Sequence, residues 1–285
     1  MKTACLIGVA ALFCASWCRQ NAAPQQAGNN ASGWLDPHGM TVEERIRVPR
    51  GFVRVPAAND SFAAYLRQLP LKPHQTPVRL YNGLIKANRG AHDAVVDLAI
   101  GDRDLHQCAD AVIRLRAEYL FRQKQFGRIH FFLTNGFRMD YDEWRKGKRL
   151  VVHGNRTHWE QRRGPNDSEA DFWNYLEVVF SYAGTLSLAK ELKPAGLADM
   201  QIGDVFIQGG SPGHAVIVID LAVDPQSGEK RFVLAQSYMP AQEIHVLRNP
   251  GDPGNSPWYG AGRGEDVRTP EWVFRSSDLK RFAEP

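Results

Sequence analysis

The chain of 285 residues is long enough for one large domain or two small ones, and its 43% hydrophobic content allows a substantial core. Its formal net charge of +4 is small for this length, and the basic residues are scattered along the chain. This composition gives no support for nucleic acid as a partner. We therefore expect a globular protein whose partners are of another kind.

The first residues are typical of an export signal. Lys2 supplies the positive start, residues 4–15 are apolar, and polar residues follow within the segment 1–23. The apolar run is too short to span a bilayer comfortably, so we expect an exported protein of the periplasm or cell envelope. Cys18 is a candidate lipidation site that would anchor the N-terminus to a membrane. Cleavage by an ordinary signal peptidase near Ser16 or Ala22 is the alternative.

Residues 24–40 are rich in Gln, Asn, Ala and Gly and predict a flexible linker, and residues 41–285 predict a single α+β domain. This domain opens with short elements. Strands are expected at 46–48 and 52–55, followed by a short helix that Asp60 or Ser61 caps and Pro70 ends. Further strands are expected at 78–81 and 94–100.

Two long helices are expected next. The first begins at Asp104, which forms a capping-box pattern with Gln107, and runs to about residue 125 with Cys108 and Val112 on its apolar face. Strands at 129–133 and 150–153 and a polar loop at 155–167 follow. Ser168 then caps the second helix, which Pro194 ends.

A glycine-rich hairpin dominates the C-terminal part of the chain. Residues 205–207 and 215–219 are strand-like, and the cluster Gly-Gly-Ser-Pro-Gly at 209–213 joins them, so that His214 opens the second strand. A third strand is expected at 232–236. Residues 249–264, rich in Gly, Pro and Asn, predict an irregular lobe, and short apolar segments at 272–274 and 279–282 close the chain.

Cys108 is the only cysteine outside the N-terminal signal region, because Cys5, Cys14 and Cys18 lie in or beside the signal. An exported domain with one cysteine forms no internal disulfide, so the thiol is either a buried small hydrophobe or a nucleophile. Its place in the first turns of a helix favours the nucleophile, because the positive end of the helix dipole lowers the pKa of a thiol.

Cys108, His214 and Gln236 together have the order of a papain-like catalytic set: a cysteine at a helix start, a histidine on a later strand and a polar residue on the next strand. Strand alternation places Phe232, Leu234 and Gln236 on one face, so Gln236 would orient the imidazole. Ser237 lies on the other face and is the weaker candidate for that role. The Cys108 amide would contribute to an oxyanion hole.

At these residues the sequence resembles the NlpC-type cell-wall cysteine peptidases. The resemblance covers about a third of the chain and rests on Gly-Asp-Val-Phe at 203–206, Gly-His-Ala-Val-Ile-Val at 213–218 and the strand at 231–237. It implies an α+β fold with a papain-like core, in which an antiparallel sheet packs on the helix that carries the cysteine, with insertions. It also implies cleavage of amide bonds in cell-wall peptides.

From about residue 46 to residue 282 the chain is similar to an uncharacterised bacterial envelope family called domain of unknown function 4846. The strings DLHQCADAVIRLRAEYL, GDVFIQGGSPGHAVIVID and LAQSYMPAQEIHVL carry this similarity. The family implies no established activity, so the chemistry depends on the residues themselves.

Each candidate residue also has a plain structural interpretation. Cys108 can be a packed core residue, and Gln236 a partner for backbone groups. Trp258 and Tyr259, in the glycine-rich lobe, are core residues or else stack on a glycan or peptide, and we group Ser237 with them as substrate-binding candidates. No spacing of His and Cys indicates a metal site, and no cofactor is expected.

Two functions therefore stay open. The first is an exported cysteine hydrolase that cleaves amide bonds, with peptidoglycan peptides as the expected substrate. The second is a non-catalytic envelope protein that binds a glycan, a peptide or a protein partner on the same scaffold.

Overall fold

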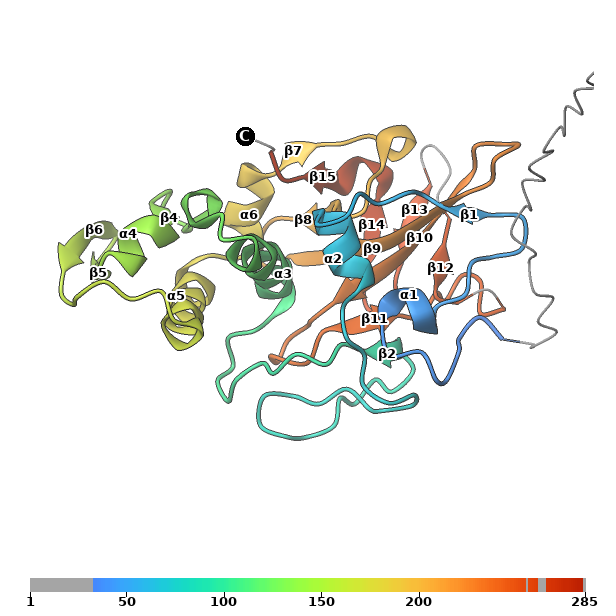
Figure 1. Cartoon of the computed structure of the whole chain (residues 1–285), viewed down its shortest axis with the longest axis horizontal. Helices are drawn as coiled ribbons and strands as arrows, with labels where there is room; N and C mark the ends of the chain where they lie inside the picture. Colours follow the sequence, from blue (N-terminus) through green and yellow to red (C-terminus); the bar gives the residue numbers. More distant parts are fainter. Residues whose placement is uncertain (1–32, 255, 261–264, 284–285) are drawn as a thin grey trace, which may run out of the picture. The chain divides into compact units, whose positions relative to one another are not determined.

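The computed structural model describes residues 33–254, 256–260 and 265–283. The expected export signal and Cys18 lie outside the described residues. Gly33–Pro285 is one compact unit that combines helices with a mainly antiparallel sheet (Figure 1). Within the described part of the chain, no helix is long and apolar enough to cross a membrane.

The main sheet of the described residues has nine strands, and its paired neighbours are antiparallel. Its order is β2 (His92–Val95), β11 (His245–Leu247), β10 (Lys230–Gln236), β9 (His214–Val223), β8 (Val205–Gln208), β15 (Leu279–Arg281) and β7 (Lys193–Pro194). In addition, β1 (Val53–Arg54) pairs with β9 and β12 (Trp258–Tyr259) pairs with β10. The sequence prediction of the hairpin β8–β9 and of the strand β10 is thus confirmed.

Helices and small hairpins surround this sheet. The helices are α1 (Val42–Arg45), α2 (Phe62–Arg67), α3 (Cys108–Arg122), α4 (Tyr141–Arg145), α5 (Glu169–Tyr182) and α6 (Thr185–Glu191), with single 3-10 turns at Phe126–Arg128, Leu197–Asp199 and Ser276–Asp278. The hairpins pair β3 (His130–Phe132) with β4 (Arg138–Asp140), β5 (Lys148–His153) with β6 (Arg156–Gln161), and β13 (Asp266–Arg268) with β14 (Val273–Arg275).

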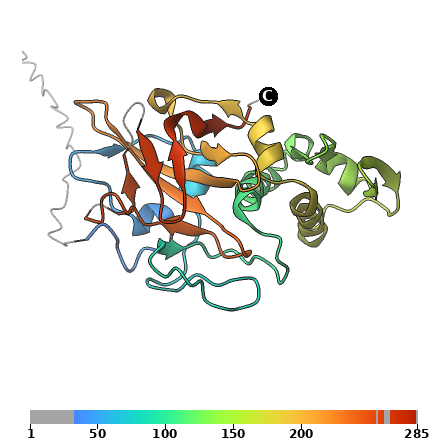
Figure 2. The same ribbon diagram turned by 180° about the vertical axis from the view of Figure 1, so that it is seen from behind.

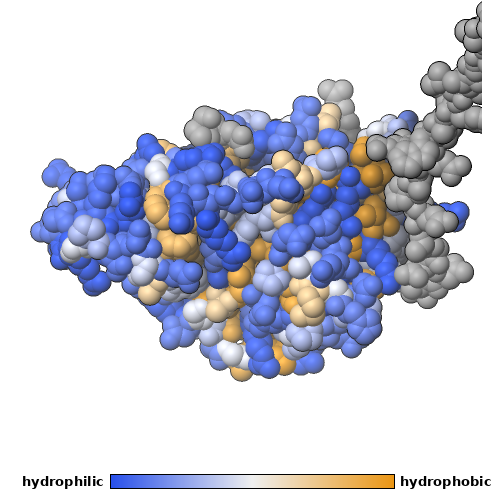
Figure 3. Space-filling view, viewed as in Figure 1, coloured by the Kyte–Doolittle hydropathy of each residue, from blue (hydrophilic) through white to orange (hydrophobic). Residues whose placement is uncertain are grey.

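The central strand β9 is buried on both faces, which explains its unbroken apolar sequence. Ala215 and Ile217 join a core that includes residues of α3, whereas Val216 and Val218 join a second core that includes Phe274 of β14. Figure 2, seen from behind, shows β13 and β14 on the side of the sheet away from α3. The outer surface in Figure 3 is largely hydrophilic, with hydrophobic residues interspersed.

Several local predictions were wrong. The segment expected as a strand at 78–81 has only isolated bridges, and the strand expected at 94–100 is β2, which ends at Val95. The segment expected as a strand at 46–48 follows α1, whose C-cap is Ile46. The helix that begins after Ser168 ends at Tyr182, and α6 is a separate helix because Gly184 interrupts the helical backbone in an extended conformation. The loop expected at 155–167 contains β6, which pairs with β5 across a turn at Gly154, where φ is +61°.

One buried carboxylate ties the N-terminal elements to the sheet. Asp220 of β9 is fully buried and accepts hydrogen bonds from Arg54 Nε at 2.7 Å and from Arg67 Nε at 2.6 Å. Arg67 also donates to the carbonyl of Leu221. Because each arginine is paired, the buried charge is compensated and the strand is fixed against β1 and α2.

Candidate functional site

Cys108 is the first residue of α3. The preceding residue, Gln107, is extended and caps the helix, and its amide N–H donates to Asp110 Oδ2 at 3.0 Å. The expected pair of Asp104 and Gln107 is present as a 3.1 Å hydrogen bond, but the helix begins one turn later than predicted. This later start places the cysteine where the helix has unsatisfied amide groups.

The thiol lies at the wall of a pocket of about 430 Å³. The pocket is bounded by the start of α3, by the turn 210–213 that joins β8 to β9, by residues 183–186 at the start of α6, and by Met239. Cys108 itself is only 8% exposed. A small opening onto this pocket is therefore the route by which a ligand would reach the sulfur.

The pKa of Cys108 is raised to about 11, chiefly by burial and also by the charge of Asp110. The amides of Ala109, Cys108 and Ala215 act in the opposite direction because they point at the sulfur. The prediction of a lowered pKa from the helix position is thus wrong, since desolvation outweighs the helix amides. The thiol is neutral at pH 7.

His214 lies at the start of β9 opposite Gln208 and is almost fully buried. Its ring packs against Tyr238, with centroids 4.9 Å apart, and against Trp272 and Phe274. Its Nε2–H donates to Gln236 Oε1 at 2.7 Å. Burial lowers the His214 pKa to about 4 in spite of the opposing hydrogen bond to Gln236, so the imidazole is neutral at pH 7.

The start of β9 brings two of the three predicted residues together, because Gln236 contacts His214. The His214 ring packs on Phe274, on the face of β9 that carries Val216 and Val218, whereas Ala215 faces the core that includes α3. Among the described residues, no hydrogen bond or electrostatic contact joins the Cys108 sulfur to the imidazole.

Ala215 directly follows His214 in the chain, and its backbone N–H donates a hydrogen bond to the Cys108 sulfur. Tyr238 packs on the imidazole, and its pKa is raised by burial, by the charge of Glu271 and by Cys108. Because Nε2 of His214 is held by Gln236, Nδ1 is the ring nitrogen that can accept a proton.

The glycines of the β8–β9 turn are required by close packing. A Cβ on Gly213 would lie 2.6 Å from the Gly210 carbonyl oxygen and would collide with the Thr185 hydroxyl of α6. Gly210 has φ of +152°, which other residues rarely adopt. The turn therefore fits against α6 and holds its end of β9 beside α3.

The polar environment of Gln236 includes three residues that the sequence did not indicate: Lys86, Glu271 and His245. Gln236 Nε2 donates to Glu271 Oε2 at 2.7 Å and to His245 Nε2 at 3.3 Å. Glu271 in turn pairs with Lys86 at 2.8 Å. Nothing in the local sequence indicates these contacts, because the groups come from distant loops and strands.

The three residues proposed for substrate binding lie in the interior. Trp258 and Tyr259 form β12 against β10, are 0% and 2% exposed, and hydrogen bond to the carbonyls of Arg47 and Arg248. Ser237 is also fully buried and donates to backbone carbonyls. The tryptophan and tyrosine rings thus have no free face for a glycan, and we correct their role to packing.

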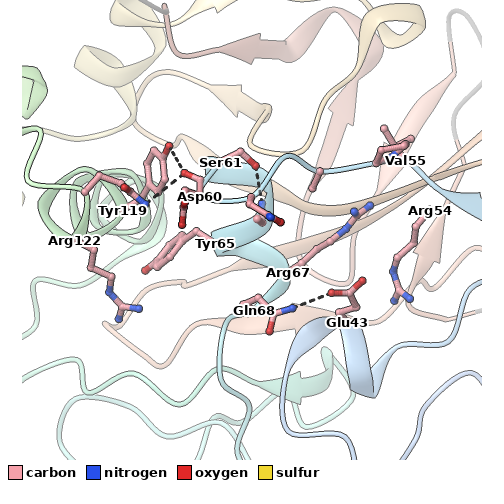
Figure 4. A pocket seen from close by; sticks show the side chains of 15 residues that line it. Glu43, Arg54, Val55, Asp60, Ser61, Tyr65, Arg67, Gln68, Tyr119 and Arg122 are labelled. Carbon is pink, nitrogen blue, oxygen red and sulfur yellow. Dashed lines mark hydrogen bonds between the residues drawn. The ribbon is translucent and has the colours of Figure 1, made fainter.

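A second pocket, of about 840 Å³, lies between α1, α2 and α3 and contains none of the predicted residues (Figure 4). Several of its polar groups already have partners: Arg54 and Arg67 pair with Asp220, and Gln68 donates to Glu43 at 2.9 Å. We therefore place the candidate site at Cys108. Among the described residues there is also no group of three or more His, Cys, Asp or Glu that could hold a metal ion.

Comparison with known proteins places the chain in a family. The family model described as "Domain of unknown function (4846)" matches residues 42–281. Neither the curated proteins nor the solved structures contain a match. Because the matched segment is most of the chain, the protein belongs to this family.

Proposed function

We propose that this member of the domain of unknown function 4846 family is a cysteine hydrolase that cleaves amide bonds. Cys108 is the nucleophile, His214 the general base and Gln236 the group that orients the imidazole, on a papain-like core of the NlpC type. The observation that carries the proposal is the 2.7 Å hydrogen bond from His214 to Gln236 at the start of β9. The next residue of this strand, Ala215, donates its backbone N–H to the Cys108 sulfur at the start of α3.

The proposed reaction begins from a neutral thiol and a neutral imidazole. His214 Nδ1 takes the thiol proton as the sulfur bonds to the substrate carbonyl carbon, and the amide at the helix start stabilises the oxygen that becomes negative. His214 then gives the proton to the leaving amine as the carbon–nitrogen bond breaks. Water, activated by the same imidazole, cleaves the thioester and restores the thiol.

A peptide of the bacterial cell wall is the substrate class that we propose. The expected export signal would carry the protein to the envelope, where Cys18 is the proposed site of a lipid anchor. The pocket beside Cys108 has several apolar side chains, among them Leu105, Phe180 and Met239. Such a lining suits a small, mainly uncharged acyl group next to the scissile bond.

The second candidate is a non-catalytic protein that binds an envelope glycan, peptide or protein partner in the same pocket. The observation that favours it is the poor reactivity expected of a thiol that is 8% exposed and has a pKa of about 11. In this case Cys108 is a packing residue at the pocket wall.

The pH dependence of hydrolysis tests the proposal. The His214 pKa of about 4 leaves the base unprotonated above that value, so peptide release from purified peptidoglycan should be nearly constant from about pH 6 to 8 and should fall as the pH decreases through about 4. Mass spectrometry of the released peptides measures the rate, and circular dichroism at each pH separates protonation from unfolding. A fall centred near pH 6.5 would contradict the buried, neutral base, and no release at any pH would favour the binding protein.

A further inference from the structure

A buried chain of polar groups continues beyond Gln236. It runs from His214 through Gln236 to Glu271 and Lys86, with successive separations of 2.7, 2.7 and 2.8 Å. The side chains of Lys86 and Glu271 are only 6% and 13% exposed. A buried ion pair next to a buried amide restricts the hydrogen-bonding patterns that these four side chains can adopt.

The carboxylate of Glu271 fixes the donor and the acceptor of each hydrogen bond from Glu271 through Gln236 to His214. An ionised carboxylate only accepts hydrogen bonds, so the NH₂ group of Gln236 must face Glu271 and its carbonyl must face His214. A carbonyl only accepts, so His214 must carry its proton on Nε2. The neutral ring then has its lone pair on Nδ1.

His245 agrees with this assignment independently. His245 Nδ1 lies 2.9 Å from the carbonyl of Glu243, which can only accept, so Nδ1 carries the proton of His245. His245 Nε2 is then an acceptor, and the Gln236 atom 3.3 Å from it must be the NH₂ nitrogen. Both N–H groups of the Gln236 amide and its carbonyl are therefore used in one orientation.

The position of Glu271 is itself fixed. It lies in the turn between β13 and β14, where the Trp272 amide donates to Thr269 Oγ1 at 3.0 Å. Trp272 packs on His214 and donates through Nε1 to Gln208 Oε1 at 2.9 Å. Lys86 pairs with Glu271 and also donates to Gln242 Oε1 at 2.7 Å.

We propose that Glu271 is a positioning residue that sets the tautomer of His214 through Gln236, with Lys86 as its counter-ion. The effect on catalysis rests on the proposed function, whereas the tautomer itself does not. With the carboxylate in place, the flipped amide of Gln236 would set its carbonyl against the carboxylate. That arrangement has no hydrogen bond and is repulsive. The nitrogen that remains free to accept a proton is thus always Nδ1.

Heteronuclear NMR of isotope-labelled histidine at neutral pH tests the assignment. In the native protein, the chemical shifts of His214 should show a proton on Nε2 and none on Nδ1, with the signals assigned by their loss in His214→Asn. In Glu271→Gln the new amide can donate or accept, so the Gln236 flip is no longer opposed. The ratio of the two His214 tautomers should change by at least roughly fivefold, because a hydrogen bond to a charge is replaced by a neutral one.

Glu243→Gln is the matched control. Glu243 is a similarly buried acid that pairs with Lys72 at 2.5 Å, but its side chain does not contact Gln236. This variant should keep the native His214 tautomer. A proton on Nδ1 of His214 in the native protein would overturn the proposal without any variant, and so would an unchanged tautomer in folded Glu271→Gln. If the tautomer changes as expected while Cys108 shows no dependence on His214, the positioning role stands and the hydrolase proposal fails.

Discussion

Replacing Cys108 with alanine should abolish the release of peptides from purified peptidoglycan while leaving the fold intact. Removal of a covalent nucleophile takes away the whole reaction path, so the rate should fall on the order of 10³-fold or more. The change removes a single sulfur atom at the wall of an existing pocket. Chromatography and mass spectrometry of the products measure the loss, and thermal unfolding confirms the fold.

Met40→Leu is the control for this variant. Met40 is 51% exposed and is not part of the lining of this pocket, and the exchange nearly conserves the side-chain volume. The control should keep most of the native rate. Full activity in Cys108→Ala would show that the sulfur is not the nucleophile and would remove the hydrolase mechanism proposed for this site.

Replacing Asp220 with asparagine should cause the largest loss of stability. The carboxylate is fully buried between Arg54 and Arg67, which are 20% and 5% exposed. Asparagine would leave the arginines without a counter-charge in the interior, which costs about 3–5 kcal/mol in the free energy of unfolding. Urea unfolding followed by circular dichroism measures the change.

Asp266→Asn is the control for Asp220→Asn. Asp266 pairs with Arg268 at 3.3 Å on the surface, where the two side chains are 43% and 67% exposed. Water screens such a pair, so its loss should hardly change the free energy of unfolding. If both variants were equally stable, the buried cluster at β9 would not have the role that we assign to it.

Local patterns in the sequence were sufficient for the elements that carry the candidate site. Helical spacing around Cys108 predicts α3, and the breaker cluster before His214 predicts the β8–β9 hairpin. Strand alternation also places Gln236 on the face where it meets His214. These predictions succeeded because each depends on residues close together in the chain.

The contacts that depend on distant segments could not be predicted. Glu271 reaches Gln236 from a turn 35 residues further along the chain, and Lys86 reaches Glu271 from the N-terminal part. The sequence left open whether Trp258 is a core residue or stacks on a ligand, and the pairing of β12 with β10 buries it. The pKa of Cys108 was misjudged for the same reason, since burial is set by the tertiary packing and not by the helix position.

The most direct test of the account is the rate at which iodoacetamide alkylates Cys108 at neutral pH in the native protein and in His214→Asn. Cys108 is the only cysteine among the described residues, and mass spectrometry of the peptide that contains it gives its rate separately from other thiols. If His214 accepts the thiol proton, the native rate should exceed that of the folded variant at least roughly tenfold. Equal rates in the two proteins would contradict the pairing of this thiol with this imidazole.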